Sequence, residues 1–142
     1  QKAVTDGEIA VEEAISRGAR RIILVGALGG ERSDHAMMHL ISSVALAKAG
    51  YDVMLTSGSE EAFPLLQEPR DLDLPPGSLF SILGLTALSG LSITNARYPL
   101  QDRELPFGSS LTVSNVAEGP VRISLKSGDA VILARPYDLT GV

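Results

Sequence analysis

The chain has 142 residues, of which 44% are hydrophobic and 20% charged, with a formal net charge of −5 at pH 7. This length and composition allow one domain, or two small ones, with a buried core. The acidic balance argues against a nucleic-acid-binding protein, which normally presents a basic face. The absence of cysteine excludes disulfides, thiolate zinc sites and a thiol nucleophile, and it fits a cytoplasmic location. No apolar run is long enough to span a bilayer, so we expect no membrane partner.

The first part of the chain, to residue 58, shows the pattern of an α/β fold. Thr5 and Glu8 have the spacing of a helix capping box, and Gly18 has the place of a terminating glycine. Alternating helices and strands with short links predict a parallel sheet covered by helices. The expected elements are a helix from Thr5 to Gly18, a strand at 21–25, a helix at 34–48 and a strand at 51–56.

From Ser78 onward the hydrophobic period changes to two, which is typical of strands. Regular turn signals between these runs indicate an antiparallel sandwich or barrel. The expected strands are 79–83, 90–94, 110–114, 121–125 and 130–134, and a further short strand is expected within 60–66. The predicted fold class is therefore α/β followed by all-β. The predicted division is an α/β domain at 1–68, a Pro-rich linker at 69–77 and a β domain at 78–142.

A glycine-rich loop separates the first expected strand from the second helix. Residues 26–35 read GALGGERSDH. A strand that ends in glycines before a helix gathers backbone N–H groups and a positive helix end, which suits a phosphate. The added Arg32 and Asp34 favour phosphate chemistry with a metal over binding alone.

Three segments together resemble the thiamine pyrophosphokinase (thiamin diphosphokinase) family. The first, KAVTD at 2–6, resembles the family's K-D-x-T-D, and GALGGERSDH resembles its G-A-x-G-G-(x)-R-x-D-H. The third is spread over the β half as GLSIT (90–94), RYPL (97–100), GSSL (108–111) and SN (114–115). Their order, spacing and passage across the α/β-to-β change make the resemblance specific.

This resemblance implies a Rossmann-like α/β domain that binds Mg²⁺ and ATP, followed by an antiparallel β-sandwich. It also implies a homodimer with thiamine held where the subunits meet. The implied reaction transfers the pyrophosphoryl group of ATP to the thiamine hydroxyl, giving thiamine diphosphate and AMP. Compared with the family, the sequence lacks part of the N-terminal domain, and Ala3 replaces an aspartate.

For the phosphate side, the resemblance implies that Asp6 is a metal ligand and that Arg32 clamps phosphate oxygens. It places Asp34 beside the phosphates, where the carboxylate orients the thiamine hydroxyl or a metal-bound water. The other expected nucleotide contacts are Lys2, Thr5, Gly29, Gly30 and His35. Each has a structural alternative: a first-turn acid for Asp6, a helix N-cap for Asp34 and a solvated loop residue for Arg32.

For the thiamine side, the best candidates for hydrogen bonds to the pyrimidine are Ser114 and Asn115, with Thr112 on the same face of the expected strand. Tyr98 is a candidate stacking partner for the thiazolium cation, and core packing is its alternative. His35 and His39 have helical i, i+4 spacing, but no third ligand is evident, so a zinc site is rejected.

Two other functions remain open from the sequence. The chain can be an inactive thiamine-binding and dimerisation module that does not bind ATP, as the departures from the family's N-terminal pattern favour. It can also be a relative that acts on another alcohol, since the acceptor-side motifs are less sharply defined than those for ATP.

Overall fold

The chain forms two helices and nine strands within the residues that the computed structural model describes, 4–29 and 32–136. In chain order these are α1 (Asp6–Ser16), β1 (Arg21–Val25), α2 (Ser33–Lys48), β2 (Asp52–Thr56), β3 (Glu61–Leu65), β4 (Arg70–Leu72), β5 (Leu79–Gly84), β6 (Leu88–Ala96), β7 (Leu100–Leu105), β8 (Asn115–Ser124) and β9 (Ala130–Arg135). The protein is thus mostly β-sheet with two helices.

The two helices begin and end close to their predicted bounds. The side chain of Thr5 caps α1 by accepting a hydrogen bond from the Glu8 N–H at 3.3 Å. Gly18, just beyond the end of α1, has φ +93°, a conformation that glycine adopts without a steric cost. Helix α2 ends before Gly50, whose φ is +98°. Local capping signals therefore mark both ends of α1 and the C-terminal end of α2, whereas Arg32 at the start of α2 makes no side-chain capping bond.

The strands form one continuous sheet in the order β1-β2-β3-β9-β5-β8-β6-β7, with β4 also paired to β8. Strands β1 and β2 are parallel, as predicted, with Val25 opposite Thr56 at their carboxyl ends. Every other strand pairing within the described residues is antiparallel. The last strand, β9, lies between β3 and β5, so it joins the parallel pair to the rest of the sheet.

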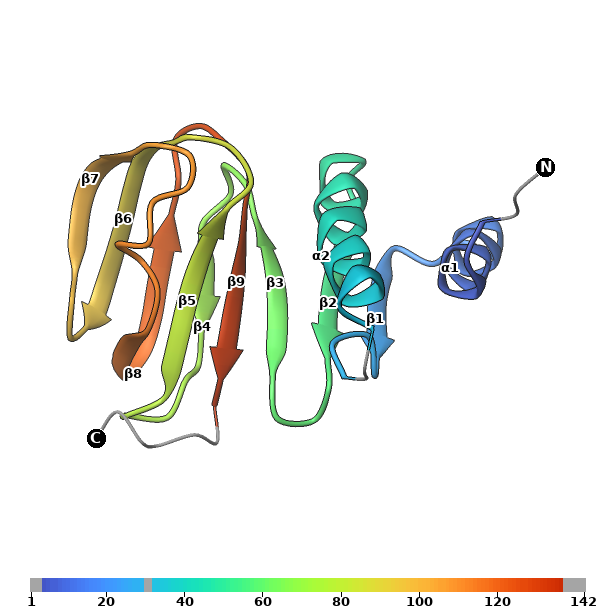
Figure 1. The fold of residues 1–142 in the computed structure, drawn as a ribbon, viewed down its shortest axis with the longest axis horizontal. Helices are drawn as coiled ribbons and strands as arrows, with labels where there is room; N and C mark the ends of the chain where they lie inside the picture. Colours follow the sequence, from blue (N-terminus) through green and yellow to red (C-terminus); the bar gives the residue numbers. More distant parts are fainter. Residues whose placement is uncertain (1–3, 30–31, 137–142) are drawn as a thin grey trace.

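Strand β8 turns the sheet into a sandwich. At its start, Asn115 and Val116 pair with β5, whereas residues further along pair with β6 on one edge and β4 on the other. A strand that leaves one sheet and enters another makes such a corner. The enclosed core includes Phe80, Ile82, Leu91, Ile93, Ile123 and Ile132. Figure 1 shows this sandwich beside the helical part of the molecule.

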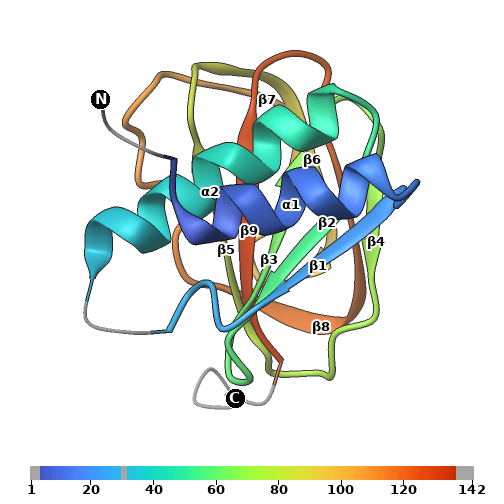
Figure 2. The same ribbon diagram turned by 90° about the vertical axis from the view of Figure 1, so that its right-hand side faces the viewer.

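Helix α2 covers the opposite face of the sheet near β2, β3 and β9. Val44 of α2 packs in a second buried cluster with Val53, Leu55, Ala62 and Val131. Helix α1 lies farther from the sandwich than α2 does (Figures 1 and 2). A Cβ added to Gly7 would lie 3.0 Å from Cε1 of His39, so the His39 ring of α2 reaches the first turn of α1.

One predicted strand is wrong. No strand forms at 110–114, and residues 111–114 form a turn and a bend. Local hydrogen bonds replace a ladder here: the Val113 N–H donates to the Ser110 carbonyl and the Leu111 N–H to Oγ of Ser109. Serine and threonine favour such turns because their side chains bond to nearby backbone groups.

The structure also adds pairings at the predicted linker. Strand β4 falls within 69–77 and forms a three-residue ladder with β8. Across the described residues, neither helix has the length and apolar character needed to cross a membrane.

Candidate functional site

The glycine-rich loop lies at the carboxyl ends of β1 and β2. The Gly26 N–H donates to the Thr56 carbonyl at 2.7 Å, and Gly26 has φ +76°. A Cβ added to Gly29 would lie 3.8 Å from Cβ of Ser57, so the loop passes close to the end of β2. Helix α2 starts a few residues later and directs its N-terminus to the same edge of the sheet. This edge is where open α/β sheets bind ligands. Gly30 lies outside the described residues.

Arg32 and Asp34 lie at this helix N-terminus and bind each other. Nε and Nη2 of Arg32 donate to Oδ1 and Oδ2 of Asp34 at 3.0 and 2.8 Å. Oδ1 of Asp34 also accepts the His35 N–H at 2.9 Å. Arg32 is the N-cap residue, whereas Asp34 lies inside the first turn, so the alternative reading of Asp34 as the N-cap is wrong.

This pairing fixes the charge of both groups. The hydrogen bond from Arg32, supported by the His35 N–H, lowers the pKa of Asp34 to about 2. The same bond raises the pKa of Arg32. Both side chains are about two-thirds exposed. The Nε and Nη2 groups of Arg32 are thus exposed to solvent but engaged by the carboxylate of Asp34.

Asp6 lies at the start of α1, next to Gly7, the residue that lies near His39 of α2. The His39 side chain, on the second turn of α2, reaches Gly7 in the first turn of α1. Oγ1 of Thr5 is occupied by its capping bond. Lys2 and Ala3 lie outside the described residues. Across residues 4–29 and 32–136, no three His, Asp or Glu side chains converge as a metal-binding group.

The second group of predicted residues lies where β8 begins. Oδ1 of Asn115 accepts the N–H groups of Tyr98 and Val116 at 3.1 and 2.8 Å, and its Nδ2 donates to the Tyr98 carbonyl at 2.9 Å. Asn115 is only 4% exposed. Its carboxamide oxygen has two lone pairs, and both are occupied. Asn115 thus holds the turn that presents Tyr98, whose own side chain is 60% exposed.

Thr112, like Asn115, is buried and hydrogen-bonded to the backbone of a neighbouring segment. Its Oγ1 donates to the Ile82 carbonyl at 2.6 Å, and the Ile82 N–H donates to the Thr112 carbonyl at 3.0 Å. The side chain is 5% exposed. Because Thr112 lies in a turn, the strand-face argument that grouped it with Ser114 does not hold.

Ser114 is exposed and has φ +64°. Its N–H donates to Oγ of Ser81 on β5 at 2.9 Å. Sequence reasoning did not find Ser81, because this contact spans 33 residues and no local pattern marks it.

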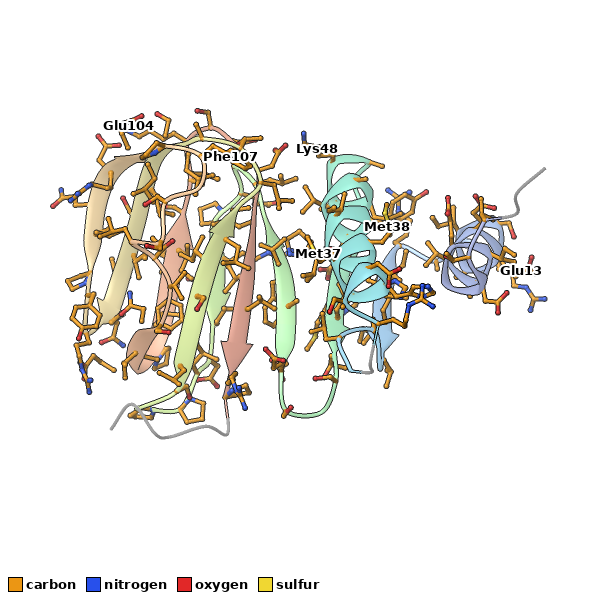
Figure 3. The ribbon with its side chains drawn as sticks, viewed as in Figure 1. Glu13, Met37, Met38, Lys48, Glu104 and Phe107 are labelled. Carbon is orange, nitrogen blue, oxygen red and sulfur yellow. The ribbon has the colours of Figure 1, made fainter. Side chains whose placement is uncertain are left out.

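The two groups of residues share one end and one face of the sheet. Figure 1 places the loop after β1 and the start of β8 at the same, lower end. Ser81 lies opposite Leu133, and Leu133 packs in the cluster beneath α2. Since directly paired residues share a face, Ser81 and the Ser114 turn lie on the face that α2 covers. In Figure 3, Phe107 lies at the opposite end of the sandwich, away from this region.

Sequence reasoning also missed an open hollow of about 250 Å³ beside β3 and β4. Its wall includes three carboxylates and an aromatic ring, contributed by Glu61, Asp71, Asp73 and Phe63. Asp71 is paired with Arg122 at 3.0 Å. None of the predicted site residues lines this hollow.

Residues 67–129 match the family model described as thiamin pyrophosphokinase, vitamin B1 binding domain. The resemblance to the thiamine pyrophosphokinase family is confirmed. The fold is similar to that of the thiamine pyrophosphokinases from Bacillus subtilis (22% identity, TM-score 0.85) and Geobacillus thermodenitrificans (23% identity, TM-score 0.81). The matches cover 98% and 100% of this chain and 66% of each of those chains.

A thiamine pyrophosphokinase from Candida albicans is more distant, with 14% identity and a TM-score of 0.70 over 93% of this chain and 52% of that chain. No curated protein sequence matches the chain. The chain therefore spans just under two thirds of the length of the similar bacterial thiamine pyrophosphokinases.

Proposed function

We propose that this chain takes part in thiamine diphosphate synthesis by transferring the pyrophosphoryl group of ATP to the hydroxyl of thiamine, leaving AMP. The observation that carries the proposal is the match of residues 67–129 to a vitamin B1 binding domain. That match includes the Ser114 turn, which shares its face and end of the sheet with the α2 N-terminus. In this proposal residues 1–68 contribute to a Rossmann-like nucleotide-binding domain, 69–77 connect, and 78–142 hold thiamine.

On the ATP side, phosphate oxygens displace Asp34 from the fork of Arg32, and the released Asp34 carboxylate orients the thiamine hydroxyl. The hydroxyl oxygen attacks the β-phosphorus, the bond from that phosphorus to the α-phosphate oxygen breaks, and the hydroxyl proton is released. Positioning and charge neutralisation are the main contributions a protein makes to such a transfer. The backbone of Gly29 and Gly30, with Lys2, Thr5 and His35, completes the phosphate contacts.

Mg²⁺ bound with ATP would neutralise phosphate charge at this site. Such an ion commonly uses one or two carboxylates, with phosphates and waters as its remaining ligands. The residues fit this partial role only: Asp6 is the proposed ligand, and the described residues offer no three-group cluster. Phosphate oxygens must therefore supply much of the coordination.

On the thiamine side, Ser114 offers an exposed hydroxyl and Tyr98 an exposed ring for the thiazolium. Asn115 and Thr112 contribute by shaping the turns around them. We propose a cytoplasmic homodimer in which thiamine lies between subunits. Apolar side chains exposed near the Ser114 turn, Leu111 and Val113, support an interface there.

A second candidate function is a thiamine-binding and dimerisation module that does not hold ATP. The mutual pairing of Arg32 and Asp34 favours it, because each group already has a partner without a nucleotide. It requires the same thiamine-side residues and none of the phosphate-side ones.

An AMP-release assay with Mg²⁺ and ATP, with and without thiamine, separates these functions. It should be run on this chain and on the longest natural form of the protein that contains it, with thiamine binding measured by calorimetry. Thiamine-dependent AMP release supports the transferase. Thiamine binding without AMP release by either form supports the module, and neither activity in either form contradicts both proposals.

A further inference from the structure

Ser114 has a backbone conformation that is unfavourable for a serine. Its φ of +64° lies in the left-handed region, which costs a non-glycine residue stability. Such residues persist where surrounding contacts hold them, and they gather at ligand sites. The contacts around Ser114 therefore decide how its hydroxyl is presented.

One side chain holds the Ser114 backbone from the neighbouring strand. Oγ of Ser81 accepts the Ser114 N–H at 2.9 Å. Ser81 follows Phe80, the last β5 residue that pairs with β8. Beyond it, the β5 edge binds the turn through the two hydrogen bonds between Ile82 and Thr112. Ser81 thus lies at the point where the β5 edge passes from β8 to the turn.

We propose that Ser81 is a positioning residue for thiamine: its hydroxyl holds Ser114 in the left-handed conformation that presents the Ser114 side chain to the substrate. This rests on the proposed function, in which Ser114 contacts thiamine. The hydroxyl of Ser81 does not contact the substrate itself. Removing it frees the Ser114 backbone to leave the left-handed region, so the substrate loses affinity while the fold remains.

The chain offers a matched control on the other sheet. Asp102 has φ +50°, and its N–H donates to Oγ of Ser92 at 2.9 Å. A strand serine thus supports a left-handed, non-glycine residue in both places, with the same bond length. Only the Ser81 pair adjoins the predicted thiamine contacts.

The experiment compares Ser81→Ala, Ser92→Ala and Ser81→Thr with the wild-type chain in its full natural form. Thiamine affinity is measured by calorimetry, thermal unfolding by circular dichroism, and amide exchange at Ser114 and Asp102 by NMR. We expect Ser81→Ala to weaken thiamine binding about fivefold, the effect of one ordinary hydrogen bond, and to speed exchange at Ser114. Ser92→Ala should speed exchange at Asp102, lower the melting temperature similarly and leave affinity unchanged. Ser81→Thr keeps the hydroxyl and should restore affinity.

Two results would overturn the proposal while leaving the proposed function standing. The first is unchanged Ser114 exchange in Ser81→Ala. The second is an equal loss of thiamine affinity in Ser81→Ala and Ser92→Ala, measured against a wild-type protein that binds thiamine. A third result would overturn the proposed function, and with it the substrate role of Ser81. In that result the wild-type protein binds no thiamine, although amide exchange at Ser114 is still faster in Ser81→Ala than in the wild type.

Discussion

The carboxamide of Asn115 binds the backbone of Tyr98 on both sides, accepting its N–H at 3.1 Å and donating to its carbonyl at 2.9 Å. Because Asn115 also accepts the Val116 N–H, one buried side chain fixes both the start of β8 and the turn that leads from β6 to β7. The Asn115 position is therefore sensitive to any change in its hydrogen-bonding groups.

Asn115→Asp should lower the free energy of unfolding by about 2–4 kcal/mol, measured by urea denaturation at pH 7. The substitution replaces a donor with a carboxylate that faces a carbonyl in a buried site. Asn95→Asp is the control, since Nδ2 of Asn95 donates to the Pro120 carbonyl at an exposed position; it should cost less than about 1 kcal/mol. Equal losses would mean that burial at Asn115 is unimportant.

Arg32→Gln should raise the pKa of Asp34 from about 2 toward 3.8, because the hydrogen bond from Arg32 is the main cause of the lowered value. In the wild type, the pairing is complete above the ordinary carboxyl pKa and disappears as pH falls through about 2. An NMR titration of the Asp34 carboxyl carbon measures both values. An unchanged pKa in Arg32→Gln would show that the pair does not persist in solution.

Asp6→Asn and Asp34→Asn should each reduce thiamine-dependent AMP release about 100-fold or more, the scale expected when a charge-positioning group is lost from an active site. Size-exclusion chromatography should show the proposed dimer intact. Asp71→Asn is the control: it also breaks an exposed arginine–carboxylate pair, with Arg122 at 3.0 Å, but lies away from the glycine-rich loop. Loss of the dimer in Asp6→Asn or Asp34→Asn would assign these residues a structural role.

The approach of Gly7 to His39 predicts an energetic coupling between α1 and α2. Alanine favours a helix interior over glycine by about 0.8–1.0 kcal/mol, and part of this gain applies at Gly7, in the first turn of α1. In this chain the added Cβ would lie 3.0 Å from the His39 ring, so Gly7→Ala should give no gain in the wild type. In a His39→Ala background it should raise the free energy of unfolding by about 0.5–1 kcal/mol. A double-mutant cycle measures this difference, and additive effects would contradict the contact.

Alanine substitutions at Gly128 and Gly108 separate the cost of a steric overlap from the cost of a positive φ. Both have positive φ, +106° and +89°. A Cβ at Gly108 meets open space, whereas one at Gly128 would overlap the Ala87 carbonyl oxygen. Gly108→Ala should cost about 1–2 kcal/mol of stability, and Gly128→Ala about 3 kcal/mol or more because the backbone must also move. Thermal unfolding of the two variants measures which of them loses more stability. Equal losses, or a larger loss in Gly108→Ala, would contradict the prediction.

The helices and most strands could be predicted because their signals are local. Thr5 marks the start of α1, and the apolar runs mark β1, β2 and β5. The left-handed conformation of Ser114 could not, because it is supported by a side chain 33 residues away and leaves no local pattern. The hydrogen bonds of Asn115 to Tyr98 could not be predicted for the same reason, since the two residues are 17 positions apart in the sequence. Polar residues in the motif were identified, but their hydrogen-bond partners were not.

The position of β9 has a consequence for how the protein is made. Strand β3 is synthesised well before β9, which is its neighbour in the sheet on the side away from β2. A nascent chain that ends before Ala130 leaves β3 and β5 without the strand that joins them. The sheet beneath α2 and the sandwich therefore join only after β9 has been synthesised.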